Sequence, residues 1–305
     1  MRYLVTGAAG FIGSQLLRTL LERGHDATGW DAYTDYYDPA LKEENAAGLP
    51  VERVDLAEDA LALDGLDGVF HLAGQPGVAS FGAAFPVYVR QNVLASQRVF
   101  EAAVAAGVRV TFASSSSIYG DAERYPTPED TTPRPLSPYG ITKLAAEHLS
   151  NAYAKEFGLD HVVVRYFTIF GPRQRPDMAL AKIVACLIGD TPFELHGDGT
   201  QSRSFTYVDD AVDATILAME RGSTGDVFNV GGGEEASMLD AIDILAEVSG
   251  RRLELRAVPR REGDQTRTLA DTSRIRASTD WEPRTTFAQG LAAQWHWAAA
   301  RVAAA

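Results

Sequence analysis

Short apolar runs alternate with stretches of helical periodicity through the first half of the chain. The apolar runs predict strands at residues 3–5, 27–30, 51–54, 69–72, 108–113 and 161–164. The helical patterns lie between them, at residues 11–21, 87–105 and 138–157. Strands of this length that alternate with helices are typical of an α/β fold with a doubly wound parallel sheet and right-handed crossovers. Ligands of such folds bind at the carboxyl ends of the strands.

The spacing becomes irregular from about Thr168 onward, and loops rich in Gly and Pro interrupt it. Helical patterns at 178–188 and 237–248, with a strand pattern at 253–257, predict a smaller α/β lobe. We assign substrate binding mainly to this lobe.

The composition is that of a globular protein, with 46% hydrophobic and 23% charged residues among 305. Such a chain can bury a sizeable core in one large or two modest domains. Its apolar runs are too short for a membrane span, and a strand pattern rather than a signal peptide follows Met1. We therefore expect a cytoplasmic protein without a membrane partner. The single cysteine, Cys186, excludes a disulfide framework or a cysteine metal cluster, and no metal site is predicted.

The formal net charge of −13 argues against nucleic acid as a partner. An acidic chain offers no general attraction to an anionic ligand, so local cations must hold any such ligand. The later part of the chain supplies arginine candidates, which are Arg173, Arg175, Arg203, Arg261 and Arg267.

A glycine-rich turn joins the first predicted strand to the first helix. Its candidate cofactor-binding residues are Gly7, Gly10, Phe11, Ile12 and Gly13. The glycines allow a tight turn and a close approach of the backbone to a pyrophosphate at the helix N-terminus. Asp31 ends the second strand, where a carboxylate accepts hydrogen bonds from both adenosine-ribose hydroxyls. Its charge would repel a 2′-phosphate, so the pattern predicts NAD rather than NADP.

Two more strand ends are candidates for the same cofactor. Asp55 and Leu56 follow the third strand and are expected at the adenine. Around the end of the fourth strand, the residues expected along the pyrophosphate and the inner ribose are Leu72, Ala73, Gly74 and Gln75.

These signals predict an NAD-binding Rossmann-type domain at residues 1–167, to which residues 205–232 return. Residues 168–204 and 233–305 are assigned mainly to the substrate-binding lobe. The two parts are therefore interleaved along the chain.

Tyr139 and Lys143 stand one helical turn apart, which puts a phenol and an ammonium group on the same helix face. We expect the positive charge of Lys143 to favour the phenolate and to lower the pKa of Tyr139. Tyr139 would then be a base for proton transfer beside the dinucleotide.

Together these motifs resemble those of the extended short-chain dehydrogenases/reductases, in the NAD-dependent sugar-nucleotide epimerase and dehydratase family. The resemblance covers nearly the whole chain. Besides the glycine-rich turn, it rests on residues 71–74, 114–120, 139–143, 165–167 and 205–210. Within the family, residues 35–39 and 171–178 most resemble the UDP-glucuronic acid 4-epimerases.

The resemblance implies a catalytic unit in which Tyr139 is the base and Lys143 also holds the nicotinamide-ribose hydroxyls. A family hydroxyl four residues before the Tyr of a Tyr-Gly pair corresponds to Ser115, counted back from Tyr119. This hydroxyl can bond the sugar oxygen and relay its proton.

The two positions after Ser115 decide the reaction within the family. Relatives that dehydrate the sugar carry an Asp-Glu pair there, and those that decarboxylate glucuronate usually carry a Glu at the second. This chain has Ser116 and Ser117. Because a hydroxyl cannot easily serve as the acid or base that elimination of water requires, simple epimerisation is predicted.

The predicted reaction is C4 epimerisation of a UDP-sugar, from UDP-glucuronate to UDP-galacturonate. Tyr139 removes the proton of the C4 hydroxyl while C4 delivers hydride to NAD, and hydride returns to the opposite face of the turned 4-keto sugar. For a glucuronate this keto sugar is a β-keto acid that can lose carbon dioxide. Hydrogen bonds to its carboxylate from Ser116, Ser117, Thr168 and the Arg175 fork are expected to slow that loss.

Arg203 and Arg261 occupy positions that the family uses for the diphosphate, and Arg267 is expected near the same phosphates. Asp264 resembles the residue that bonds the uridine ribose. Asn92 is interpreted as structural, fixing the backbone near the catalytic strand.

Many relatives pair two subunits through the helices predicted here at 87–105 and 138–157, so the resemblance implies a homodimer. Apolar positions on these helices allow the pairing, but they would equally serve a monomer's core: Val93, Val99, Leu144 and Leu149.

Three other functions stay open from the sequence. A UDP-glucose/UDP-galactose 4-epimerase would run the same chemistry on a neutral hexose. A UDP-glucuronate decarboxylase is opposed by the absence of a carboxyl group at Ser117. A non-catalytic dinucleotide-sensing protein would keep the fold for binding alone, although such proteins often lack the Tyr or the Lys.

Overall fold

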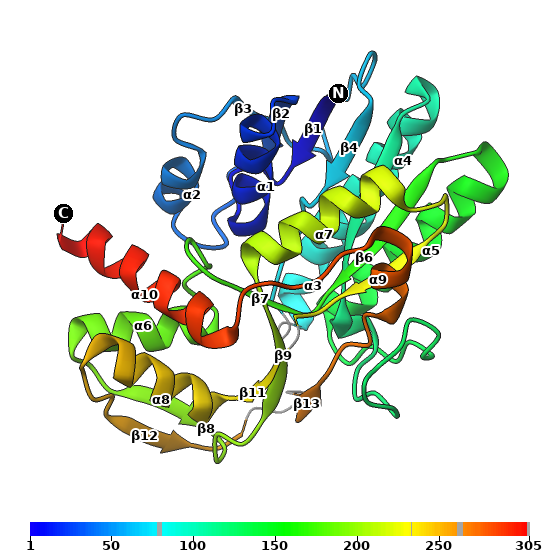
Figure 1. The fold of residues 1–305 in the computed structure, drawn as a ribbon. Coiled ribbons are helices and arrows are strands. Elements are labelled where there is room, and N and C mark those ends of the chain that lie inside the picture. Colours follow the sequence, from blue (N-terminus) through cyan, green and yellow to red (C-terminus); the bar gives the residue numbers. More distant parts are fainter. Residues whose placement is uncertain (78–80, 233, 261–264, 304–305) are drawn as a thin grey trace.

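The computed structural model describes residues 1–77, 81–232, 234–260 and 265–303 (Figure 1). In this part of the chain the main sheet has seven parallel strands, in the order β10-β6-β5-β4-β1-β2-β3. Their bounds are Arg2–Thr6 (β1), Asp26–Asp31 (β2), Val51–Arg53 (β3), Gly68–His71 (β4), Arg109–Ser115 (β5), His161–Tyr166 (β6) and Val227–Val230 (β10). The predicted doubly wound α/β sheet is confirmed.

Helices cover both faces of the main sheet. On one face α1 contacts α7, which also contacts α9, and on the other face α4 contacts α5. Their bounds are Phe11–Glu22 (α1), Ala95–Ala106 (α4), Pro138–Phe157 (α5), Val208–Arg221 (α7) and Ser273–Thr279 (α9). The shorter helices are Pro39–Ala46 (α2) between β2 and β3, then Gly82–Ala84 (η1), Phe85–Tyr88 (α3) and the π-helix Val89–Leu94 (η2) between β4 and α4, and Ser116–Ile118 (η3) directly after β5.

Neighbouring residues of the central strands belong to separate cores. Leu4 of β1 packs in a cluster with Val99 of α4, whereas Val5 packs in a cluster with Leu16 of α1 and Val212 of α7. All five side chains are at most 1% exposed. Because a strand points successive side chains to opposite faces, a sheet covered on both faces buries whole strands. This explains why the strand sequences are continuous apolar runs rather than alternating ones.

The strand order reverses beside β1, which lies between β2 and β4. Crossovers on the two sides of this point leave in opposite directions, which opens a crevice at the carboxyl ends of β1 and β4. The loops that follow these strands, at Gly7 and at Leu72, therefore meet at one edge of the sheet.

A smaller lobe lies beside this edge and has its own sheets and helices (Figure 1). In one sheet β9 pairs with β7, β11 and β13, and in the other β8 pairs with β12. The strand bounds are Thr168–Phe170 (β7), Phe193–His196 (β8), Ser202–Tyr207 (β9), Glu234–Ser237 (β11), Leu255–Val258 (β12) and Arg267–Thr268 (β13). The helices that pack on one another there are Ala179–Gly189 (α6), Met238–Ser249 (α8) and Phe287–Ala303 (α10).

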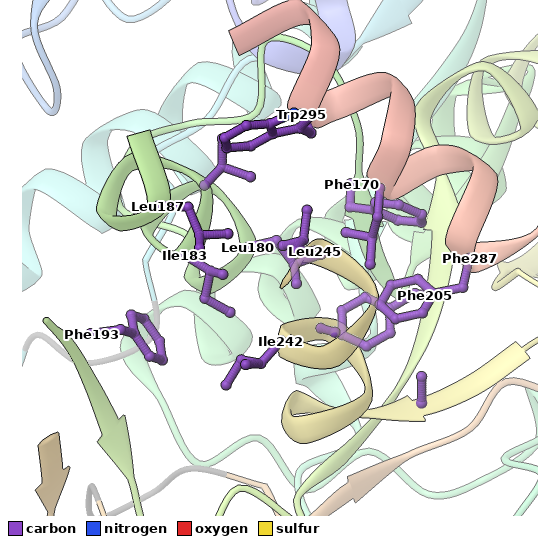
Figure 2. Close-up of a cluster of buried hydrophobic side chains, with 14 of the residues drawn as sticks. Phe170, Leu180, Ile183, Leu187, Phe193, Phe205, Ile242, Leu245, Phe287 and Trp295 are labelled. Atoms are coloured by element: carbon purple, nitrogen blue, oxygen red, sulfur yellow. The ribbon is translucent and has the colours of Figure 1, made fainter. Parts of the chain in front are cut away.

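Aromatic rings join the helices of this lobe to its sheet (Figure 2). Phe205 of β9 stacks on Phe287 of α10 with ring centroids 4.5 Å apart, and Phe170 of β7 meets Phe287 edge to face at 5.2 Å. Leu245 of α8 is fully buried in the same cluster. The lobe thus has a hydrophobic core of its own, separate from the two cores of the main sheet.

The chain returns to the main sheet slightly later than expected. Residues 205–207 belong to β9 of the smaller sheet, because β9 hydrogen-bonds only to strands of that sheet among the described residues. The main sheet resumes with α7 and β10, and α9 packs against both although it lies in the segment assigned to the lobe. The division into two domains stays a prediction. Within the described part of the chain, every helix is too short or too polar to cross a membrane.

Candidate active site

Two adjoining cavities open at the carboxyl ends of the main-sheet strands. The first is lined by the glycine-rich turn, the ends of β2 and β4, and the start of α5. The second lies between that helix start, the serines after β5 and the smaller lobe. Tyr139, Tyr166 and Arg175 line both cavities, so the predicted base stands where the two spaces meet.

The glycine-rich turn leaves the N-terminus of α1 open to the first cavity. Gly7 has a φ of +73°, and a Cβ atom at Gly13 would lie 2.1 Å from the Gly7 carbonyl oxygen. Gly10 caps α1 without a side-chain hydrogen bond. The first N–H groups of the helix are therefore left to a ligand, and the positive end of the helix dipole favours a phosphate there.

Asp31 lies in the same cavity, at the end of β2. One carboxylate oxygen accepts from the Ala9 backbone N–H at 3.0 Å and the other from the Tyr33 N–H at 2.7 Å. Each oxygen keeps a further lone pair with which it can accept a hydrogen bond from a ribose hydroxyl. Lys42, which the sequence reasoning missed, also lines this cavity and donates to Thr34 Oγ1 at 2.9 Å.

Of the cofactor-binding candidates, Asp55 alone does not line the first cavity. Its carboxylate pairs with Arg90 Nη2 at 2.7 Å and accepts from the Ala57 N–H at 3.0 Å. Leu56 lines the cavity in its place. The other candidates are brought together there: Gly7, Gly10, Phe11, Ile12, Gly13, Asp31, Leu72, Ala73, Gly74, Gln75, Tyr139 and Lys143.

Asn92 holds the loop after β4 against α5. Its carboxamide pairs with both backbone groups of Gln75, at 2.7 Å and 3.1 Å, and donates to Thr142 Oγ1 at 3.0 Å. The side chain is fully buried, and Asn92 lies in the π-helical segment η2. A Cβ atom at Gly74 would come within 2.8 Å of the Asn92 Oδ1 atom, so only glycine fits beside this amide.

Lys143 is buried on the main-sheet side of α5. Its ammonium donates to the Ala113 carbonyl at 2.8 Å and lies 5.0 Å from the centre of the Phe112 ring. Burial lowers the pKa of Lys143 to about 8, although the negative charge of Glu147 opposes this shift.

Besides burial, the groups that shift the pKa of Tyr139 in the ligand-free protein are Ser115, Arg175 and Tyr88, and the effect expected of Lys143 stays a prediction. Burial raises the pKa of the Tyr139 phenol, and the groups that lower it are the hydrogen-bonded Ser115 and the positive charge of Arg175. Lys143 instead directs its ammonium to the Ala113 carbonyl, because that acceptor compensates its burial. The two groups that lower the pKa of Tyr139 both line the second cavity.

The serines after β5 face the second cavity. Ser115 Oγ accepts from the Ser117 N–H at 3.2 Å and so caps the short helix η3. Ser115, Ser116 and Ser117 line this cavity together with Thr168 and Arg203. Three consecutive serine residues therefore line the same cavity as Tyr139.

Of the remaining arginine and aspartate candidates, one lines the second cavity, one does not, and two lie outside the described residues. Arg267 pairs with Glu235 at 2.7 Å and 2.8 Å and does not line the second cavity. Arg203 lines it, while its guanidinium donates to the Gln265 carbonyl at 2.7 Å. Arg261 and Asp264 lie outside the described residues.

Arg175 lines both cavities and is held by Asp177. Its Nε and Nη2 donate to the two carboxylate oxygens of Asp177, at 3.0 Å and 3.1 Å. The Tyr36 hydroxyl donates to the same carboxylate at 3.3 Å. The fork that we assigned to a substrate carboxylate therefore already has a carboxylate on it.

A buried polar network behind the site was missed from the sequence. Glu147, one helical turn after Lys143, accepts from Arg165 Nε at 3.1 Å and Nη2 at 2.8 Å, and also from the Ser114 hydroxyl. Arg165 Nη1 donates to the Tyr119 hydroxyl at 2.8 Å. The spacing of Glu147 from Lys143 was a usable signal, because it places the carboxylate on the face that carries the ammonium.

Comparison with known proteins connects this geometry to a family. The model of the NAD dependent epimerase/dehydratase family matches residues 3–231. YtcB of Bacillus subtilis, an uncharacterized UDP-glucose epimerase, is 38% identical over 303 residues, covering 95% of this chain and 96% of that protein. The UDP-glucuronate 4-epimerase of Thermodesulfobacterium geofontis is 34% identical over 309 residues, covering 97% and 95% respectively.

A solved structure shows the same fold. The UDP-glucuronic acid 4-epimerase of Bacillus cereus, in complex with UDP-glucuronic acid and NAD, matches with a TM-score of 0.94 and 38% identity. The match covers 97% of this chain and 98% of that one.

Gly13→Ala is expected to weaken NAD binding by about 100-fold or more, because the new Cβ would lie 2.1 Å from the Gly7 carbonyl oxygen and push the turn into the phosphate site. Calorimetric titration with NAD measures the effect. Gly189→Ala is the matched control, since its nearest atom would be 3.9 Å away. Equal NAD affinity in Gly13→Ala and the parent would contradict this account of the turn.

Lys143 is expected to titrate with a midpoint near its lowered pKa of about 8 in the ligand-free protein. NMR of lysine side chains labelled with ¹³C would show one signal shifting near that pH, and Lys143→Met would remove it. If the signal that Lys143→Met removes titrates above about 10, the ordinary range for an exposed lysine, the burial argument is wrong.

Proposed function

The chain belongs to the NAD-dependent epimerase/dehydratase family, and we propose that it converts UDP-glucuronate to UDP-galacturonate by inversion at C4. It is an epimerase of UDP-sugars that uses NAD. The observation that carries the choice of substrate is the second cavity, where Arg175, Ser116 and Ser117 line the same space as Tyr139. These side chains offer a carboxylate a guanidinium and two hydroxyls.

The first cavity fits NAD by its donors and its shape. The uncapped N-terminus of α1 suits the pyrophosphate, and Asp31 suits the adenosine ribose while opposing a 2′-phosphate. Lys143 lines the same cavity and would hold the hydroxyls of the nicotinamide ribose. When bound, NAD accepts a hydride from the sugar carbon and returns it.

Tyr139 moves the proton in the proposed reaction. Its phenolate takes the proton of the C4 hydroxyl as a 4-keto sugar forms. After the sugar ring has turned and hydride has returned to the opposite face of C4, the phenol gives the proton back to the C4 oxygen. Ser115 bonds the phenol and steadies its charged form, and Arg175 favours that form through its positive charge. The protonation state of Tyr139 is thus coupled to the residues proposed to hold the sugar.

Ser116 and Ser117 select epimerisation over the other outcomes. Neither hydroxyl serves as the acid or base for elimination of water, and both can hydrogen-bond the carboxylate of the 4-keto acid. Together with Thr168 and Arg175, they would hold that carboxylate near the ketone plane and slow the loss of carbon dioxide. These points oppose a decarboxylase, and the presence of both Tyr139 and Lys143 opposes a purely binding protein.

The second candidate is a UDP-glucose 4-epimerase, the same chemistry on a neutral sugar. Two observations favour it: the likeness to YtcB of Bacillus subtilis, and the carboxylate of Asp177 on the Arg175 fork. The charge on the sugar is what separates the two candidates.

The test of the proposal is incubation of the purified protein with UDP-glucuronate and, separately, with UDP-glucose, followed by NMR of the products. We expect UDP-galacturonate and no pentose nucleotide. Arg175→Gln should lower kcat/KM for UDP-glucuronate by about 10-fold to 100-fold, the range for a charge-assisted hydrogen bond, and should affect UDP-glucose less.

Arg173→Gln is the matched control, because Arg173 stands in the same loop but lines neither cavity. Tyr139→Phe should abolish turnover of either sugar. Conversion of UDP-glucose alone would reject the proposed substrate, and release of a pentose product would reject the role given to the serines and Arg175.

We also propose that the chain forms a homodimer through α3, η2 and α5, which contact one another. Exposed apolar side chains lie along these elements: Phe85, Val87, Val89, Leu94 and Ile141. Of the positions named from the sequence, Val99 is buried in the chain's own core and Leu149 packs against it. The exposed apolar side chains, rather than Val99, are therefore available for contact with a second copy of the chain.

Leu94→Asp, at a side chain that is 44% exposed, is expected to convert a dimer to a monomer, because it would put a charge in the centre of an apolar interface. Light scattering coupled to gel filtration measures the mass. Val302→Asp, at a position on α10 that is 55% exposed, is the control. A monomeric parent protein would refute the proposed pairing.

A further inference from the structure

The carboxylate of Asp177 occupies the Nε–Nη2 edge of the Arg175 guanidinium, an edge on which arginine binds a carboxylate through two hydrogen bonds. The pair is bidentate, through Nε to one oxygen at 3.0 Å and Nη2 to the other at 3.1 Å. This is the geometry in which an arginine fork binds a free carboxylate most specifically. Asp177 thus makes the contact that a sugar acid would make.

Asp177 is an anion at neutral pH. Partial burial works against ionisation, yet the hydrogen bonds and the positive charge of Arg175 hold the pKa of Asp177 below its ordinary value. The pair as a whole therefore carries no net charge where it faces the second cavity. A neutral pair offers little attraction to a sugar carboxylate that approaches from that cavity.

Asp177 is placed so that it can leave Arg175. Its side chain is 34% exposed, and it stands in the loop between Pro176 and Met178, just before α6. The only other side chain that bonds it among the described residues is Tyr36, at a long 3.3 Å. Released into solvent, the carboxylate would regain its hydration at little cost in structure.

We propose that Asp177 is a specificity-determining residue, which holds the Arg175 fork while the sugar is neutral and is displaced from it by the carboxylate of a sugar acid. The inference rests on the proposed function, because it takes Arg175 as the group that binds the acidic sugar. Two carboxylates on one guanidinium would repel each other, so the substrate exchanges with Asp177 rather than joining it.

Competition of this kind has a defined consequence for substrate choice. A neutral hexose leaves the Arg175–Asp177 pair intact, whereas a sugar acid gains Arg175 only at the expense of that pair. Asp177 therefore narrows the preference for an acidic sugar over a neutral one. A residue that merely oriented Arg175 would widen that preference.

The experiment measures the ratio of the dissociation constants of UDP-glucose and UDP-glucuronate by calorimetry. The protein is loaded with NAD and carries Tyr139→Phe, so that neither sugar is turned over. Adding Asp177→Asn keeps the shape of the side chain but removes its charge. We expect the ratio to rise by about fivefold, the scale of a partly exposed ion pair.

Tyr36→Phe provides a second variant, because it removes the hydrogen bond from Tyr36 to Asp177. It should also raise the ratio, but by less than Asp177→Asn does. Asp35→Asn is the charge control, since Asp35 is exposed and lines neither cavity. An unchanged or lower ratio in Asp177→Asn would overturn the inference and assign Asp177 to orienting Arg175.

The two proposals fail in different ways. If the active parent protein epimerises only UDP-glucose, the proposed substrate is wrong whatever the ratio does. If it epimerises UDP-glucuronate while Asp177→Asn leaves the ratio unchanged, only the role of Asp177 is wrong. Binding of neither nucleotide to the NAD-loaded protein would overturn both.

Discussion

The buried ion pair between Glu147 of α5 and Arg165 of β6 fastens the catalytic helix to the sheet. Its side chains are 5% and 8% exposed, and Glu147 also accepts from Ser114 at the end of β5. Such a pair costs desolvation, but loss of one partner would leave a buried charge, at about 3–5 kcal/mol. Because Tyr139 and Lys143 stand on the same helix, the Glu147–Arg165 pair fixes the position of both side chains relative to the carboxyl ends of the strands.

One carboxylate acts on Lys143 and another on Arg175, and the two carboxylates differ in how firmly they are held. Glu147 lies one turn from Lys143 in the buried network and supports its charge through the sheet side. Asp177 sits on Arg175 at the cavity wall, where its side chain is 34% exposed. A buried partner cannot exchange with a ligand, whereas an exposed one can. An acidic protein thus presents a cation to an anionic substrate without leaving that cation unpaired.

Much of the fold could be predicted because its signals are local. The helix predicted at 138–157 has those bounds in the structure, since Ser137 caps its start and Gly158 ends it in the left-handed conformation. The boundary of the smaller lobe could not be predicted from local sequence signals. Residues 205–207 have the pattern of a strand in either sheet, and only pairing with β7, β11 and β13 decides which sheet they join.

The sequence by itself determined the sheet class, the open turn at Gly7 to Gly13 and the shared helix face of Tyr139 and Lys143. These features follow from strand and helix periods and from the freedom of glycine, which act over a few residues. Only the tertiary structure decided which groups the side chains meet, such as Asp55 with Arg90 or Lys143 with the Ala113 carbonyl. The reason is that burial and charge pairing depend on segments that folding brings together from distant parts of the chain.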